Sequence, residues 1–192
     1  MAFKIVSLDG NTGSGKSTVL SELEAMGYLV FPEDLDKWGS MLNMFYSDPK
    51  RWTFTFQMTV INSHCHRREV INTSCRNYEN EFVFIERCPQ ACRVFSTTCR
   101  EMGFKNDEEH SLYEELMNRL AWDPEYKYYI ETDVNVCMDR ITKRGRECES
   151  GIDCSYLETV ASKYGNIDFD MRFNGLNDPH RIACDILTSL KN

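Results

Sequence analysis

The stretch Gly10-Asn11-Thr12-Gly13-Ser14-Gly15-Lys16-Ser17 decides the fold of this chain. It fits the pattern GxxxxGK followed by Ser or Thr at every fixed position, and it follows the apolar segment 3–8, which we expect to form a strand. A strand, a glycine-rich turn and a helix in that order distinguish a phosphate-binding loop from a chance match. The sequence therefore predicts a protein that binds a nucleoside triphosphate.

The residue types of this loop explain how it would hold phosphate. Glycines let the backbone fold around a polyphosphate so that several N–H groups point inward, and the N-terminus of the next helix adds a partial positive charge. Lys16 is expected to reach the β- and γ-phosphates, and the Ser17 hydroxyl is expected to ligate Mg²⁺. We therefore expect ATP to bind the loop from Gly10 to Thr18. A glycine-rich turn without a ligand is the alternative.

Bulk composition limits the class of protein. A length of 192 residues suits one domain with a single sizeable core. The net charge of −8 argues against a partner that is duplex nucleic acid or an anionic membrane, because both need a broad basic face. No apolar run approaches the length of a membrane span, and the chain enters its first strand at once, so we expect no signal peptide.

Nine cysteines also bear on location. None of them are spaced as CxxC, which disfavours a zinc ribbon or a thioredoxin-like site. An odd number of cysteines in a nucleotide-binding protein favours reduced thiols and a cytoplasmic location. We expect most of them to be small apolar fillers.

Short apolar segments alternate with helical patterns along the chain. The predicted strands are 3–9, 28–32, 81–86, 126–131 and 167–173. The predicted helices are 16–26, 36–46, 50–77, 89–103, 108–121, 133–143, 153–165 and 178–190. This alternation predicts an α/β fold of the P-loop NTPase type, with three layers and a central parallel sheet of about five strands covered by helices on both faces. Ligands of such sheets bind beyond the carboxyl ends of the strands.

Glu33 stands at the carboxyl end of the second predicted strand. A carboxylate within hydrogen-bond reach of a substrate hydroxyl can accept its proton as phosphoryl transfer proceeds. Glu33 is therefore a candidate general base. The alternative is that Glu33 or Asp34 only caps the next helix.

The third predicted strand ends in Glu86 and Arg87. An acidic residue that closes an apolar strand is where a phosphate-loop protein usually places its second magnesium contact. Arg87 could bridge the donor and acceptor phosphates. A structural ion pair between Glu86 and Arg87 is the alternative.

The densest basic patch contains Arg140, Arg144 and Arg146. Arg144 and Arg146 flank Gly145, which indicates that a helix gives way there to a mobile lid near 140–150. Planar guanidinium groups match the oxygens of a transferring phosphoryl group. A solvated basic helix end is the alternative.

The segment 50–58 is rich in aromatic residues and includes Gln57. An apolar slot with one amide could hold a nucleobase, because an amide is both donor and acceptor and can pair with a base edge. Composition alone would favour a plain core helix.

Taken in order along the chain, these elements resemble the deoxyribonucleoside kinase family, which includes deoxycytidine, deoxyguanosine and mitochondrial thymidine kinases and virus-encoded relatives. The resemblance runs from Ile5 to about Leu157. It rests on the phosphate loop, an EPxxxW-like element at 33–38, a Tyr-x-Asp-Pro-Lys-x-Trp-x-x-x-Phe-Gln stretch at 46–57, Glu86-Arg87-Cys88, and the arginine-rich lid. These elements in the same order make the match specific.

The resemblance implies a nucleotide-salvage enzyme that uses ATP and Mg²⁺ to phosphorylate the 5′-hydroxyl of a deoxynucleoside, with a pyrimidine such as thymidine or deoxycytidine favoured. It assigns Glu33 as the base and Trp38 to the substrate pocket. It assigns Tyr46 and Glu149 to the sugar 3′-hydroxyl, and Gln57 to the base edge. The transferring phosphoryl would be stabilised by Lys16, Arg87, Arg140, Arg144 and Arg146, and Mg²⁺ held by Ser17 and Glu86.

Departures from the family pattern lie in the base pocket. Ser96 stands where relatives place a phenylalanine that stacks on the base, although Phe95 is its neighbour. His64 and Cys92 stand where deoxycytidine-preferring relatives have an Arg and an Asp. These differences weaken an exclusive preference for deoxycytidine and leave room for thymidine.

Two other functions share parts of this pattern. A nucleoside monophosphate kinase, such as a thymidylate kinase, would need a cation for the acceptor phosphate, whereas Glu33 would repel it. A GTPase-type switch is disfavoured because no NKxD motif occurs. The resemblance also implies a homodimer, with the stretch 52–76 as a candidate interface.

Overall fold

Five parallel strands form the centre of the protein. The structure, a computed structural model, describes residues 3–149 and 151–191, apart from the side chains of Asp36 and Cys148. The strands are β1 (Lys4–Asp9), β2 (Val30–Phe31), β3 (Phe82–Glu86), β4 (Tyr126–Glu131) and β5 (Met171–Asn174), in the order β2-β3-β1-β4-β5. The predicted parallel α/β fold is confirmed.

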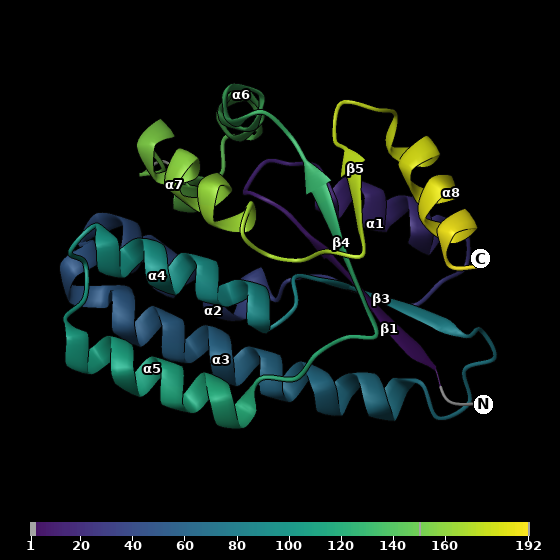
Figure 1. Ribbon diagram of the computed structural model, residues 1–192, viewed down its shortest axis with the longest axis horizontal. Coiled ribbons are helices and arrows are strands. Elements are labelled where there is room, and N and C mark those ends of the chain that lie inside the picture. The colour runs from purple at the N-terminus through teal and green to yellow at the C-terminus, as the bar shows by residue number, and fades with distance from the viewer. Residues whose placement is uncertain (1–2, 150, 192) are drawn as a thin grey trace.

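Helices connect these strands. The described residues form α1 (Lys16–Ala25), α2 (Leu35–Ser47), α3 (Pro49–Ser74), α4 (Arg93–Glu101), α5 (Asp107–Leu120), α6 (Val134–Arg144), α7 (Cys154–Tyr164) and α8 (Pro179–Ser189), with short 3₁₀ turns at Gln90–Cys92 and Glu147–Glu149. As Figure 1 shows, α1 and α8 cover one face of the sheet, and the remaining helices lie on the other. Three layers result.

The strands are apolar on both sides because both faces are covered. Val6 and Phe84 pack with Leu23 of α1 on one face. Their neighbours Val83 and Ile85 point to the opposite face and pack against Ile71 of α3. This alternation fixes the register of β1 against β3, since a shift by one residue would exchange the two faces.

The predicted elements differ from the observed ones mainly at the sheet edges. β2 is only two residues long rather than 28–32, because it pairs with β3 alone and Pro32 has no N–H with which to extend the ladder. β5 begins at Met171 rather than 167. Just before it, the carboxylate of Asp170 accepts a hydrogen bond from the backbone N–H of Lys127.

The cysteines mostly fill the interior as predicted. Cys75, Cys88, Cys92, Cys99 and Cys137 are buried, and no disulfide links the cysteines whose side chains the structure describes. Among the described residues, no helix combines the length and the apolar character needed to cross a membrane.

Candidate active site

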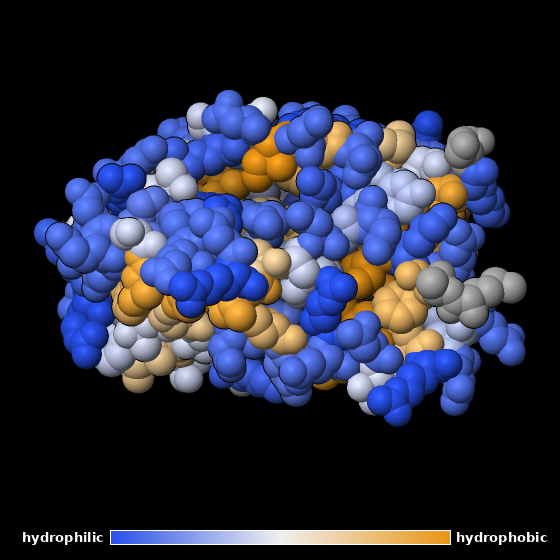
Figure 2. Space-filling model, turned by 60° about the horizontal axis from the view of Figure 1, so that its bottom comes forward, coloured by the Kyte–Doolittle hydropathy of each residue, from blue (hydrophilic) through white to orange (hydrophobic). Residues whose placement is uncertain are grey.

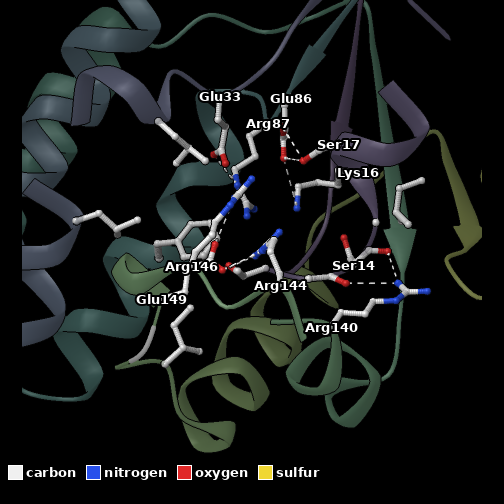
Figure 3. Close-up of a pocket in the computed structure, with 18 of the residues that line it drawn as sticks. Ser14, Lys16, Ser17, Glu33, Glu86, Arg87, Arg140, Arg144, Arg146 and Glu149 are labelled. Carbon is white, nitrogen blue, oxygen red and sulfur yellow. Dashed lines mark hydrogen bonds and ion pairs between the residues drawn. The ribbon is translucent and has the colours of Figure 1, made fainter. Parts of the chain in front are cut away.

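A cavity of about 600 Å³ opens where the strands end, a volume within the range of small-molecule sites. Figure 3 shows the polar side chains of the phosphate loop at one part of it, and aromatic side chains also line the cavity. The predicted site residues that line it are Thr12, Gly13, Ser14, Gly15, Lys16, Ser17, Thr18, Glu33, Trp38, Tyr46, Gln57, Glu86, Arg87, Arg140, Arg144, Arg146 and Glu149. Two more predicted site residues, Gly10 and Asn11, are buried and do not line the cavity.

The phosphate loop owes its path to close backbone approaches. Gly13 has φ 81°, and a Cβ atom there would lie 2.6 Å from the carbonyl oxygen of Cys137 on α6. A larger residue would therefore be strained in conformation and would also collide with the helix. The loop carries a buried hydroxyl, Ser14 Oγ, that has no hydrogen-bond partner in the structure.

Lys16 begins α1 and points back into the loop. Its Nζ donates to the carbonyl oxygen of Asn11 at 2.9 Å and lies 3.9 Å from Glu86 Oε1. Burial and the nearby charge of Arg87 lower the pKa of Lys16 to about 8. An incoming polyphosphate would favour the protonated ammonium, so this lysine is suited to bind it.

Ser17 and Glu86 face one another across the loop (Figure 3). The Ser17 hydroxyl lies 3.1 and 3.2 Å from the two carboxylate oxygens of Glu86. Arg67 of α3 donates to the backbone carbonyl of Glu86 at 2.6 Å and so fixes the end of β3. The described residues contain no cluster of three or more acidic, His or Cys side chains able to hold a metal. One hydroxyl and one carboxylate nonetheless fit Mg²⁺, which takes few protein ligands and completes its shell with water and phosphate.

Arg87 is held in a left-handed backbone conformation, with φ 60°, that is uncommon for a residue with a side chain. Its guanidinium donates to Glu33 Oε1 at 2.7 Å, to the carbonyl of Gly10 at 2.6 Å and to the hydroxyl of Tyr164 at 2.9 Å. The backbone strain costs on the order of 1–3 kcal/mol, and these contacts offset it. Arg87 thus pairs with Glu33 rather than with Glu86.

Glu33 follows β2 and is largely buried beside Arg87. The alternative that Glu33 or Asp34 only caps the next helix is not supported. Asp34 occupies the N-cap position of α2, but its side chain makes no capping hydrogen bond and pairs with Lys37 instead. Burial lowers the pKa of Arg87, but the charges of Glu33, Tyr164 and Glu86 outweigh it and raise that pKa well above its usual value. Glu33 therefore faces a permanent cation.

The arginines of the lid segment separate into two groups. Arg144 donates to Glu149 Oε2 at 2.6 Å, and Arg146 Nη1 lies 3.5 Å from Glu149 Oε1, so these guanidinium groups gather on one carboxylate (Figure 3). Arg140 instead donates to the carbonyl oxygens of Ser14 and Gly175, at 3.0 and 2.9 Å. Phosphate contact by Arg140 stays a prediction, since its guanidinium is engaged with loop carbonyls.

The aromatic part of the cavity holds the predicted base-binding residues. The rings of Trp38 and Phe56 lie 5.5 Å apart, and the indole N–H of Trp38 is buried without a partner in the structure. Gln57 lines the cavity beside them. Phe95 also lines it, with the guanidinium of Arg87 4.6 Å from its ring centroid, whereas Ser96 is fully buried outside the lining. Of these two neighbours, only Phe95 faces the cavity.

His64 and Cys92 contact one another, with Nε2 and Sγ 3.1 Å apart. Burial, with the charges of Arg67 and Arg87, lowers the pKa of His64 well below its usual value. Burial raises the pKa of Cys92 to about 12. Both side chains are therefore uncharged near neutral pH, whereas the family resemblance leads one to expect an Arg and an Asp here in a chain that prefers deoxycytidine.

Three contact residues were missed by the sequence analysis: Arg67, Tyr164 and Lys105. Arg67 could have been found, because His64, Arg67 and Ile71 are buried at helical spacing on one face of α3. Tyr164 and Lys105 carry no local signal, since their partners are distant in sequence.

Comparisons with known proteins identify a family and individual proteins that this chain resembles. The sequence model of the deoxynucleoside kinase family matches residues 6–171. A protein of Frog virus 3 (isolate Goorha) that carries a provisional deoxynucleoside kinase name is 32% identical over 183 residues, which cover 95% of this chain and 91% of the relative. Deoxycytidine kinase 2 of Gallus gallus is 29% identical, with 97% of this chain and 83% of the relative covered.

A solved structure of deoxyadenosine kinase from M. mycoides has the same fold. It superposes with a TM-score of 0.84 at 20% identity and covers 97% of this chain and 98% of that one. At this level of identity the likeness supports the fold alone.

Proposed function

The chain belongs to the deoxynucleoside kinase family and is an ATP-dependent phosphotransferase, and we propose that it phosphorylates the 5′-hydroxyl of a pyrimidine deoxynucleoside. The observation that carries the proposal is the Glu33–Arg87 pair, which lines the same cavity as Lys16 and Ser17. A carboxylate there suits an uncharged hydroxyl acceptor and repels a phosphate.

In the proposed mechanism, Glu33 accepts the proton of the 5′-hydroxyl as the oxygen attacks the γ-phosphorus. Arg87, already fixed by the Gly10 carbonyl and Tyr164, places its charge between the acceptor and the phosphoryl group. Lys16 holds the donor phosphates. Because phosphoryl transfer requires little covalent chemistry from the protein, this positioning of charge supplies most of the rate.

The lid residues and Tyr46 complete the substrate contacts in this proposal. Arg144 and Arg146 both contact the carboxylate of Glu149, and in this proposal their guanidinium groups stabilise the transferring phosphoryl group. Glu149 and Tyr46, both in the cavity lining, would read the sugar 3′-hydroxyl.

Mg²⁺ belongs to the proposal as the ion that the Ser17 hydroxyl and the Glu86 carboxylate would hold. When bound, it neutralises charge on the donor phosphates. The chain's own part is to keep the two ligands facing one another, which Arg67 does through the Glu86 carbonyl.

A pyrimidine base is supported by the aromatic part of the cavity around Gln57 and by a relative that is named a deoxycytidine kinase. Ranking kcat/KM for thymidine, deoxycytidine, deoxyadenosine and deoxyguanosine with Mg·ATP tests this preference. We expect both pyrimidines to exceed both purines, and a purine at the head of the ranking would reject the preference.

Gln57→Ala should mainly weaken nucleoside binding, because the amide would lose its hydrogen bonds to the base edge. We expect the KM for the nucleoside to rise on the order of tenfold to a hundredfold, with kcat reduced much less. Steady-state kinetics at saturating ATP measures both values. Gln90→Ala, outside this cavity, is the matched control, and an unchanged KM in Gln57→Ala would argue against base recognition there.

A homodimer through the face of α3 and α5 is part of the proposal. Figure 2 brings this side of the molecule forward and shows apolar side chains among hydrophilic ones. Val70 of α3 and Leu112 and Leu120 of α5 are exposed large apolar residues that support an interface here. A monomeric mass at micromolar concentration in sedimentation equilibrium would reject the dimer.

We also place the protein in the cytoplasm, which the unpaired state of the described cysteines supports. Fractionation of cells that express the protein tests this location. Recovery of the protein outside the cytosolic fraction would reject it.

A further inference from the structure

Asp9 is a carboxylate at the end of β1 that the proposed mechanism does not use. It is fully buried and does not line the cavity, so it cannot contact a substrate there. Burial raises the pKa of Asp9 to about 6, and the hydroxyl of Ser7 and the charge of Arg87 limit the rise, so the group is ionised at neutral pH. Among the ion pairs of the described residues, none includes Asp9. A buried charge without an ion-pair partner is costly, which indicates a role beyond filling space.

The carboxylate of Asp9 accepts a hydrogen bond at each of its oxygens. Oδ2 accepts from the hydroxyl of Ser7 at 2.8 Å, which fixes the side chain against its own strand. Oδ1 accepts from the backbone N–H of Cys88 at 3.2 Å. The side chain of Asp9 therefore reaches across to the end of β3 and holds the peptide group that joins Arg87 to Cys88.

Three successive residues at the start of the phosphate loop hold the dipeptide Arg87-Cys88. The carbonyl of Leu8 accepts from the backbone N–H of Arg87 at 3.0 Å. The carbonyl of Gly10 accepts from Arg87 Nη1 at 2.6 Å. Asp9 lies between these two residues and accepts from Cys88. The main chain and the guanidinium of Arg87 are thus both held by the segment that leads into the loop.

The bond from Cys88 to Asp9 bears on the unusual backbone of Arg87. Its φ of 60° is left-handed, and such a conformation persists only where surrounding contacts hold it. Because the peptide group is planar, the ψ of Arg87 sets the direction of the Cys88 N–H. Cys88 is buried, so this N–H would be left unsatisfied without the carboxylate. Asp9 therefore favours the backbone conformation from which Arg87 Nε meets Glu33 Oε1 at 2.7 Å (Figure 3).

We propose that Asp9 is a positioning residue for phosphoryl transfer: by holding the Cys88 N–H, its carboxylate keeps the backbone of Arg87 left-handed and the guanidinium directed at Glu33 and the acceptor. This inference rests on the proposed function, in which Arg87 stabilises the transferring phosphoryl group.

Asp9→Leu tests the proposal, because it removes both acceptor oxygens and nearly keeps the size of the side chain. We expect kcat to fall on the order of 10²-fold, the effect of displacing a catalytic group by about 1 Å. The KM for ATP should not rise, since Lys16 and the N–H groups of the loop are retained. Steady-state kinetics at saturating nucleoside measures both values. A kcat within about threefold of the unmodified protein, or a rise in KM that matches the fall in kcat, would overturn the proposal.

Asp9→Asn gives a graded test and does not depend on the folding of Asp9→Leu. The amide oxygen can still accept from Cys88, but a neutral acceptor holds the N–H less strongly than a carboxylate does. We expect kcat to fall roughly threefold to tenfold. An unchanged kcat would contradict the proposal. A fall as large as that of Asp9→Leu would assign the effect to charge and overturn the role of Asp9 as an acceptor.

Asp170→Leu is the matched control. The carboxylate of Asp170 accepts from the backbone N–H of Lys127 at 2.7 Å, so the substitution removes the same kind of bond beside the sheet. Asp170 does not line the cavity. We expect its kcat to stay close to that of the unmodified protein. Equal falls in Asp170→Leu and Asp9→Leu would indicate a general loosening of the sheet and overturn the role of Asp9.

A double-mutant cycle with Arg87→Lys shows whether Asp9 acts through Arg87. The lysine keeps a positive charge but lacks the guanidinium that the loop carbonyls and Glu33 hold. We expect Asp9→Leu to lower kcat much less in the Arg87→Lys background than in the unmodified protein. Falls that simply multiply would show that the two residues act independently, contrary to the proposal.

The Nε–H of Arg87 provides a signal that does not depend on turnover. It is buried against Glu33 and should give an arginine resonance protected from solvent exchange in ¹H–¹⁵N NMR spectra, identified by its absence in Arg87→Lys. We expect this resonance to shift and to lose protection in Asp9→Leu but not in Asp170→Leu. An unchanged resonance in Asp9→Leu would overturn the proposal.

Failure of the inference and failure of the proposed function give different results. If the unmodified protein phosphorylates no deoxynucleoside, the proposed function is wrong, and the Arg87 resonance still shows whether Asp9 holds the guanidinium in place. If the protein phosphorylates deoxynucleosides and neither kcat nor the resonance responds to Asp9→Leu, only the role of Asp9 is wrong.

Discussion

Glu33→Gln is expected to lower kcat by a factor on the order of 10²–10⁴, the usual contribution of a general base. The amide keeps the size of the side chain and can still accept a hydrogen bond from Arg87 Nε, which lies 2.7 Å from Glu33 Oε1. It cannot take a proton from the 5′-hydroxyl. The variant should therefore fold and bind ATP while losing turnover, which steady-state kinetics and ATP titration measure separately.

Asp34→Asn is the matched control for this substitution. Asp34 is the neighbouring carboxylate, pairs with Lys37 and lies outside the cavity lining. We expect its kcat to remain close to that of the unmodified protein. If Glu33→Gln kept a kcat within about tenfold of the unmodified protein, Glu33 would not be the base.

Lys16→Met should abolish most turnover by removing the cation that holds the donor phosphates. We expect kcat/KM for ATP to fall on the order of 10²–10³ or more. Lys143→Met, which removes an exposed cation near the end of α6, should have little effect. Equal losses in the two variants would show that net charge, and not the position of Lys16, matters.

Lys16 also predicts a pH dependence whose sign can be worked out. Its pKa in the free protein is lowered to about 8, and the triphosphate favours the protonated form. Below that pH the ammonium is already present. Above it, binding must take up a proton, so kcat/KM for ATP should decline as pH rises through about 8. Lys16→Met should lack this decline, and a decline that persisted in the variant would assign it to another group.

The sequence located the site residues best where they belong to a contiguous motif or stand at the carboxyl end of a predicted strand. The phosphate loop is a contiguous motif, so Lys16 and Ser17 could be placed without a structure. Glu33 and Glu86 could be placed because the carboxyl ends of parallel strands meet at one edge.

The contacts between site residues that are far apart in the sequence could not be predicted in the same way. The pairing of Arg87 with Glu33 rather than Glu86 depends on a left-handed backbone at Arg87, which nothing in the local sequence indicates. The contact of Lys105 with Gln57 spans 48 positions, and it forms only because the chain reverses after α4 and α3 packs alongside. Such contacts arise from tertiary packing and have no periodic signature.

The central claim is that a hydroxyl, and not a phosphate, accepts the phosphoryl group. The most direct test is Mg·ATP-dependent phosphorylation of thymidine and deoxycytidine beside thymidine monophosphate under identical conditions. The account predicts conversion of the nucleosides to their 5′-monophosphates, with thymidine monophosphate left unchanged because Glu33 repels its charge. Turnover of thymidine monophosphate alone would contradict the account and identify a nucleoside monophosphate kinase.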